Sequence, residues 1–257
     1  SVRSSLLSLF FLPSQAFDKE ALFPINGPIW SLFFELIANF VYCLVAGMLS
    51  TLAITVILVV SFLGLTISAM HHGNLDVGFL WDLPSLLAGA SRSTFGIFLG
   101  ILLFRKRTAI SRLLMKLPFS GAPMTAISIA AVTLILVSPK TTFDAAIDIV
   151  CVALVFPVLV MLAAQPTFEA LKRPMLFLGA ASYPIYVFHL PLGELLHAFL
   201  GGRQALYAPI SGLLLVGSLL IFSAWVERRI DIPLRKRLAA KLIRSSEQQP
   251  PQGRALR

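Results

Sequence analysis

Three of the ionisable side chains inside apolar stretches of this sequence mark positions where a charge is costly and therefore informative. They are Glu35, Arg92 and His189. An isolated charge in lipid costs several kcal/mol, so such groups are expected to pair, to face the interior of a helix bundle or to line a wet cavity. A carboxylate, a guanidinium and an imidazole can hold a proton, move it, or bind a polar substrate. These residues are the first candidates for chemistry.

The composition indicates which elements must position them. Hydrophobic residues make up 57% of the chain and charged residues 13%, and the mean hydropathy is +0.86, unlike a soluble domain. Several apolar runs reach the roughly 20 residues that a membrane-spanning helix needs. We therefore predict an all-α fold, a polytopic transmembrane bundle of about seven spans. The expected spans are about 29–49, 51–70, 84–104, 119–138, 145–164, 175–199 and 206–226.

Three parts follow from these spans. Residues 1–28 are interrupted by prolines and are expected to be an extracytoplasmic lead-in loop. Residues 29–226 are the predicted transmembrane domain, and residues 227–257 a basic cytoplasmic tail. The tail is rich in Gln and Pro after Ser245 and is expected to be disordered there.

The basic residues predict the orientation in the membrane. Most Lys and Arg residues lie in the loops at 105–118 and 165–174 or in the tail, and the opposite segments hold only Arg3, Lys19, Lys140 and Arg203. Cytoplasmic loops are enriched in Lys and Arg, so the C-terminus is predicted to be cytoplasmic. The net charge of +9 is thus attributed to topology. The lipid bilayer is an expected partner and nucleic acid is not.

Depth places the three ionisable residues in one layer. At about 1.5 Å per residue, Glu35 lies roughly 9 Å, Arg92 roughly 12 Å and His189 roughly 15 Å from the outer ends of their spans. They are expected to share the outer part of the membrane. Glu35 and Arg92 could also be a purely structural ion pair, and a lone His on an apolar helix is more often a hydrogen-bonding residue between helices than a catalyst.

Two short motifs surround Glu35 and His189. Residues 26–35 are Asn-Gly-Pro-Ile-Trp-Ser-Leu-Phe-Phe-Glu, and residues 179–191 are Gly-Ala-Ala-Ser-Tyr-Pro-Ile-Tyr-Val-Phe-His-Leu-Pro. Both resemble signatures of the membrane acyltransferase-3 family, Pro-x-Trp-Ser-Leu-x-x-Glu and Gly-x-x-Ser-Tyr-x-x-Tyr-x-x-His. The matching positions are Pro28, Trp30, Ser31, Leu32 and Glu35, then Gly179, Ser182, Tyr183, Tyr186 and His189. Two motifs in this order form a specific signal.

The resemblance implies acyl transfer in the bacterial inner membrane. The donor would be a cytoplasmic acyl-CoA, commonly acetyl-CoA, and the acceptor a hydroxyl of an extracytoplasmic glycan or lipid-linked sugar, with no bound cofactor. A hydroxyl loses its proton as it attacks an acyl carbonyl, and a neutral imidazole held by a carboxylate is the usual base. On this hypothesis His189 is an acid-base or hydroxyl-orienting residue, and Glu35 is its partner or a second proton acceptor.

Other residues of the motifs would bind substrate. Hydrogen bonds would come from Ser31, Ser182, Tyr183 and Tyr186. Trp30 would offer a flat face to a sugar ring, although a Trp at the start of a span is more often an interfacial anchor.

Arg92 and the basic cluster at residues 105–107 each have two possible roles. Arg92 would hold a developing oxyanion or a donor phosphate, or pair with Glu35. The Arg105-Lys106-Arg107 cluster could receive the phosphates of coenzyme A, but a loop that only fixes topology is the simpler explanation. The His, Cys and carboxylate residues lack the spacing of metal ligands, so no metal is expected.

Two other classes of function stay open. Family members usually begin with further spans and an Arg or Lys followed by a His thought to be catalytic, a pattern missing before residue 29. We therefore expect an N-terminally truncated chain or a degenerate relative, which leaves an inactive membrane scaffold as one alternative. The other is a transporter or flippase-like carrier of a saccharide, in which the three ionisable residues relay protons or bind cargo.

Overall fold

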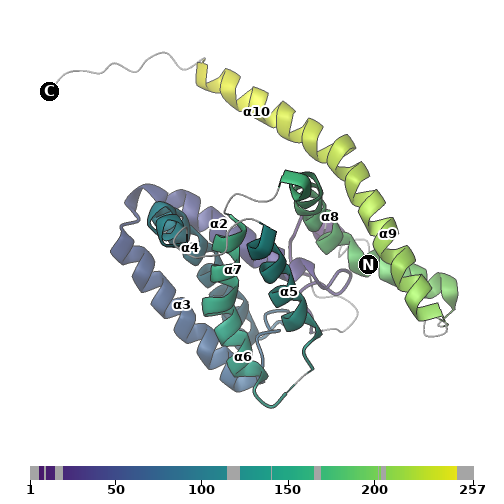
Figure 1. Cartoon of the computed structure of the whole chain (residues 1–257), viewed down its shortest axis with the longest axis horizontal. Helices are drawn as coiled ribbons and strands as arrows, with labels where there is room; N and C mark the ends of the chain where they lie inside the picture. Colours follow the sequence, from purple (N-terminus) through teal and green to yellow (C-terminus); the bar gives the residue numbers. More distant parts are fainter. Residues whose placement is uncertain are drawn as a thin grey trace. The chain divides into compact units, whose positions relative to one another are not determined.

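The computed structural model describes residues 6–8, 10–14, 20–114, 122–139, 141–164, 169–201, 203 and 207–247. The named elements within these ranges are all helices, and an isolated antiparallel bridge joins Ala21 and Leu80. Figure 1 shows these helices in order along the chain, and the chain divides into two compact units, residues 1–172 and 173–257. The predicted all-α class is confirmed.

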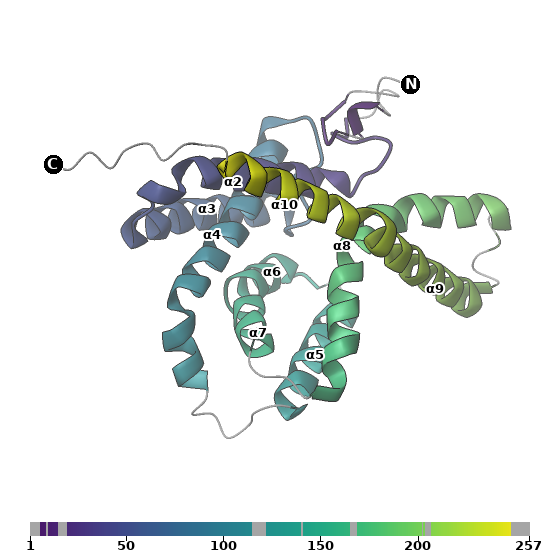
Figure 2. The same cartoon turned by 90° about the horizontal axis from the view of Figure 1, so that it is seen from above.

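Unit 1 is a bundle built around α4. Its elements are α2 (Ile29–Val45), the 3-10 turn η1 (Ala46–Met48), α3 (Thr51–His72), α4 (Leu83–Leu114), α5 (Ala122–Val137), α6 (Asp144–Val150), the π-helical segment η2 (Cys151–Val155) and α7 (Phe156–Ala163). Both α2 and α3 pack against α4. Helix α7 lies between α4 and α5 (Figure 2).

Local sequence sets both ends of α3. The Ser50 hydroxyl oxygen accepts a hydrogen bond from the backbone N–H of Ala53 at 3.1 Å, which caps the first turn. Gly73 ends the helix with φ +77°, and its N–H donates to the Ala69 carbonyl at 2.8 Å. A glycine adopts this left-handed conformation without steric cost. The C-terminal end determines where the loop at 73–82 begins.

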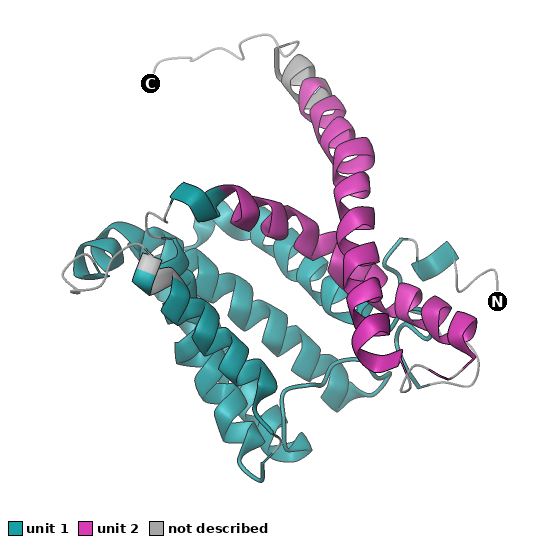
Figure 3. Ribbon diagram, turned by 45° about the vertical axis from the view of Figure 1, so that its right-hand side comes forward, with its two compact units in different colours: residues 1–172 teal, residues 173–257 magenta. Residues whose placement is uncertain are grey.

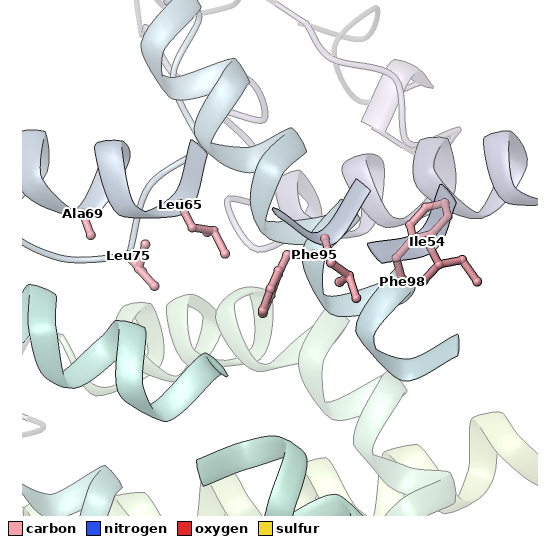
Figure 4. Packing of buried hydrophobic residues seen from close by; sticks show 7 residues of the cluster. Ile54, Leu65, Ala69, Leu75, Phe95 and Phe98 are labelled. Carbon is pink, nitrogen blue, oxygen red and sulfur yellow. The ribbon is translucent and has the colours of Figure 1, made fainter. Parts of the chain in front are cut away.

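The core of unit 1 joins α3, α4 and the 73–82 loop. Its buried residues are Ile54, Leu58, Leu65 and Ala69 of α3, Phe95 and Phe98 of α4, and Leu75 of the loop. Leu75 lies beside Leu65 and Ala69 (Figure 4). Many other large apolar side chains face outward, as expected where lipid is the solvent.

Unit 2 contains most of α8 (Glu169–Leu200), then α9 (Ala208–Val226), the π-helical segment η4 (Glu227–Asp231) and α10 (Ile232–Glu247). The last three form one uninterrupted helical rod (Figure 3). The Phe188 ring of α8 packs edge-on against Phe222 of α9 with centroids 4.9 Å apart. The predicted tail thus begins as η4 and α10, whereas most of the stretch after Ser245 that is expected to be disordered lies outside the described residues.

Each π-helical segment ends two residues before a proline. Segment η2 ends at Val155 ahead of Pro157, and η4 ends at Asp231 ahead of Pro233. Proline has no N–H and its ring collides with the carbonyl four residues earlier. In both segments, a backbone hydrogen bond to the carbonyl five residues earlier replaces the α-helical bond to the carbonyl four residues earlier. In η2, the Phe156 N–H donates to the Cys151 carbonyl.

The helices agree with the predicted spans. Within the described residues, six are long and apolar enough to cross a membrane: Ile29–Met48, Thr51–His72, Leu83–Leu114, Asp144–Ala163, Glu169–Leu200 and Ala208–Ala240. A shorter apolar helix, Ala126–Val137, occupies the fourth predicted span, whose first residues lie outside the described part. The chain is a multi-pass membrane protein of about seven spans.

Loops of unit 1 predicted to share a side of the membrane meet in the structure. The Leu22 N–H of the lead-in donates to the Phe79 carbonyl of the 73–82 loop at 2.8 Å. At the other end of α3 and α4, the Arg105 guanidinium donates to the Leu49 carbonyl at 2.8 Å. The two faces of the membrane are therefore assigned consistently within this unit.

Candidate functional site

Trp30 of the first motif lies within an aromatic cluster at the start of α2. It packs on Phe34 and Phe79, with ring centroids 6.3 Å away in each case. The lead-in residues Leu22 and Phe23 belong to the same buried cluster. Only 8% of Trp30 is exposed. A sugar ring could therefore meet the Trp30 face only if the surrounding loop moved.

That loop, residues 73–82, is held tightly against Trp30 through Gly78. Gly78 has φ +118°, and a Cβ at this position would overlap the Trp30 ring and the backbone of Gly89. The Ser85 hydroxyl oxygen accepts from the N–H groups of Gly78 at 3.2 Å and Leu80 at 3.1 Å. The loop is thereby fixed to the first turn of α4.

Arg92 of α4 extends to the same loop. Its Nη1 donates to the Leu75 carbonyl at 2.9 Å, and its guanidinium carbon lies 5.4 Å from the centroid of the Trp30 ring. A guanidinium over an aromatic face is attracted by the ring quadrupole. The structure therefore joins two residues that sequence reasoning selected for unrelated reasons, Trp30 from a motif and Arg92 from its charge.

Glu35 and Arg92 do not form the direct ion pair considered as an alternative. Within the described residues, ion pairs join Lys172 to Glu169 and Arg235 to Asp231. Glu35 lies one turn beyond Ser31 on α2 and is largely exposed.

The basic cluster Arg105-Lys106-Arg107 is partly occupied by local contacts. Besides the bond from Arg105 to Leu49, the Arg107 Nη1 donates to the Phe104 carbonyl at 2.9 Å, and its guanidinium carbon lies 4.0 Å from the centroid of that ring. These contacts favour the topological explanation of the cluster over phosphate binding.

The second motif lies on one face of α8. At 3.6 residues per turn, Gly179, Ser182, Tyr186 and His189 share a side of the helix. Ala181, Pro184 and Phe188 lie on the opposite side; the first two are buried, and Phe188 packs on α9. Tyr183 is 55% exposed and Tyr186 36%. The motif therefore faces away from the contact between α8 and α9.

Hydrogen bonds within α8 orient the motif side chains. The Ser182 hydroxyl donates to the Gly179 carbonyl at 2.7 Å. The Nδ1 atom of His189 lies 2.7 Å from the Tyr186 carbonyl oxygen, and the two rings have centroids 6.0 Å apart. Tyr186 and His189 are thus brought together as expected, whereas the predicted partnership of His189 with Glu35 joins residues of different units and stays a prediction.

Asp148 of α6 is a residue that sequence reasoning missed. Its Oδ2 accepts a hydrogen bond from the Leu75 N–H at 2.9 Å. It is an ionisable residue inside the fifth predicted span, so the rule that selected Glu35 and Arg92 would also have found it. Within the described part of the chain, no three His, Cys, Asp or Glu side chains gather closely enough to hold a metal ion.

Comparison with known proteins gives one match. The sequence model of a family described as an acyltransferase domain, of the acyltransferase-3 type, matches residues 3–227. Both motifs and all the candidate residues lie inside that range. No curated protein and no solved structure matches the chain.

Proposed function

Because this chain belongs to the acyltransferase-3 family, we propose that it moves an acyl group, acetyl in the first instance, from a cytoplasmic acyl-CoA to a hydroxyl of an extracytoplasmic glycan or lipid-linked sugar. The proposed location is the bacterial inner membrane, with the C-terminus in the cytoplasm. The family model covers most of the chain, which supports the general class of reaction.

The observation that supports this proposal most directly is the hydrogen bond between His189 and the Tyr186 carbonyl. A carbonyl oxygen can only accept, so the 2.7 Å contact with Tyr186 requires the proton on Nδ1 of the imidazole. A neutral imidazole in this tautomer keeps its lone pair on Nε2. That atom is the one that can take a proton from an attacking hydroxyl.

The chemistry then needs few further groups. As the acceptor hydroxyl oxygen bonds to the thioester carbonyl carbon, its proton moves to Nε2 of His189. The carbon–sulfur bond then breaks, and the leaving thiolate of coenzyme A takes this proton back from His189, which returns to the neutral form. Arg92 is the candidate to stabilise the developing oxyanion, because a guanidinium has five N–H donors and the Leu75 carbonyl accepts from one of its nitrogens.

A cell-based comparison tests this function. Cells would express the protein as wild type, Glu35→Gln, His189→Ala or His197→Ala at matched membrane levels, and NMR would measure the ester content of their surface polysaccharide. His197 is the control because it lies exposed on the same helix but outside the motif. We expect esters to be lost in the first two variants and kept in the third.

Other outcomes would point elsewhere. Unchanged esters in Glu35→Gln and His189→Ala would overturn the acyltransferase assignment of these residues. Loss of saccharide export without loss of esters would indicate the carrier, and no effect of any variant would indicate the scaffold.

A further inference from the structure

The backbone of Leu75 is bound at both ends by side chains of opposite charge from two different helices. Asp148 of α6 accepts from its N–H, and Arg92 of α4 donates to its carbonyl, each at 2.9 Å. The Leu75 side chain is only 5% exposed and belongs to the core of unit 1. A loop residue is therefore fixed by its side chain, its donor and its acceptor at once.

The charges match the peptide groups that they meet. A carboxylate faces a backbone donor and a guanidinium faces a backbone acceptor, and hydrogen bonds to charged groups are roughly twice as strong as neutral ones. Both charges lie in the outer parts of apolar helices, where an unpaired charge is expensive. Asp148 and Arg92 thus compensate each other through Leu75 without direct contact.

The same loop reaches the first family motif. Three residues after Leu75, Gly78 packs directly on the Trp30 ring, and Arg92 lies over that ring. A displacement of Leu75 would therefore disturb both contacts on Trp30, the one from Gly78 and the one from Arg92. Asp148 itself lies on another helix and contacts this arrangement through the Leu75 N–H.

We infer that Asp148 is a positioning residue of the site formed by Arg92, Trp30 and the 73–82 loop: through Leu75 it holds Arg92 and Trp30 in their working arrangement. Its importance for the reaction rests on the proposed function, whereas the arrangement itself can be measured without any reaction. Asp144 provides the matched control. It is the same residue type at the start of the same helix, but its carboxylate accepts from Thr141 of the adjoining loop.

The first measurement uses Trp30 as a reporter. The chain has three Trp residues, and the other two, Trp81 and Trp225, are exposed and can be replaced by Phe. In this background, purified in lipid nanodiscs, Asp148→Ala should shift the Trp30 emission to the red and increase its quenching by acrylamide. Asp148→Asn keeps an acceptor oxygen and should restore the original signal, and Asp144→Ala should not change it.

The second measurement is transfer of radiolabelled acetyl groups from acetyl-CoA to the saccharide fraction of host membranes, per folded molecule. Misplacement by about 1 Å can cost about a hundredfold in rate, so we expect Asp148→Ala to lose at least about tenfold and Asp148→Asn to regain most of it. An unchanged Trp30 signal in Asp148→Ala, or a changed signal with normal transfer, would overturn the inference. If the reference protein itself transfers no acetyl group, the proposed function fails, and fluorescence alone still decides whether Asp148 positions Trp30.

Discussion

The guanidinium of Arg92 lies over the ring of Trp30, with 5.4 Å between its central carbon and the ring centroid. The Trp30 ring and the Leu75 carbonyl are therefore the partners of Arg92, the role for which Glu35 was considered from the sequence. Cation–π contacts contribute about 0.5–2 kcal/mol, more when they are desolvated. This site of unit 1 is therefore organised around an arginine, a tryptophan and a loop backbone.

Replacing Arg92 should destabilise the protein. Arg92→Ala leaves the Leu75 carbonyl without this donor, which should cost about 1–3 kcal/mol. Arg92→Lys keeps a charge but not the planar guanidinium, so its loss should be smaller. Thermal unfolding in detergent micelles, followed by circular dichroism, would measure both. Arg107→Ala is the control, because Arg107 bonds only one turn away, to Phe104; equal unfolding temperatures for Arg92→Ala and this control would contradict the prediction.

A single methyl group at Gly78 should disrupt the loop. Gly78→Ala combines a φ of +118° with overlap on Trp30 and Gly89, so we expect a loss of more than about 1 kcal/mol. Gly96→Ala is the contrasting variant: a Cβ there meets nothing within 4 Å, and Ala is favoured over Gly inside a helix by up to about 1 kcal/mol. The order of their unfolding temperatures tests the packing, and Gly78→Ala as stable as wild type would refute it.

Neutralising Glu35 should leave stability unchanged. Glu35→Gln keeps the shape of a side chain that makes no direct ion pair within the described residues. A structural ion pair predicts the opposite, because breaking one in a membrane leaves an uncompensated charge. The unfolding temperature of this variant, beside that of wild type, separates the two. A marked fall would restore the structural interpretation.

The orientation can be read from cysteine labelling in intact cells. In a background with Cys43→Ala and Cys151→Ala, Asp76→Cys in the 73–82 loop should react with a membrane-impermeant maleimide, and Arg107→Cys should react only after the cells are opened. Both positions are exposed, so accessibility reports the side of the membrane. The reverse pattern would invert the predicted topology.

The positions of the spans could be predicted from the sequence because lipid imposes one simple requirement. A run of about 20 apolar residues is both the signal and the physical condition for a spanning helix. The length of the helical rod after α9 could not be predicted in this way. Its apolar run ends near Val226, but the helix continues through Leu, Arg, Lys and Ala residues, which favour helix without lipid.

The candidate residues were easier to find than their partners. Glu35, Arg92 and His189 stand out as charges or imidazoles in apolar runs, and the motifs added Trp30 and the α8 face. The partner of Arg92 is a backbone carbonyl 17 residues earlier in the chain, and a backbone acceptor leaves no mark in the sequence. Gly78 gave no signal for the same reason, since its role depends on a ring 48 positions away that only folding brings close.

The two π-helical segments change the angular phase of the helices that contain them. Each inserts one residue more per turn than an α-helix, so every side chain beyond it is rotated by about 100° relative to an unbroken helical wheel. The side chains of α10 and α7 are therefore offset from the faces of α9 and α6 that precede them. A relative with one residue fewer in η2 or η4, and without the proline that follows, would form an unbroken α-helix there. Its side chains beyond that point would still face the same directions as in this chain.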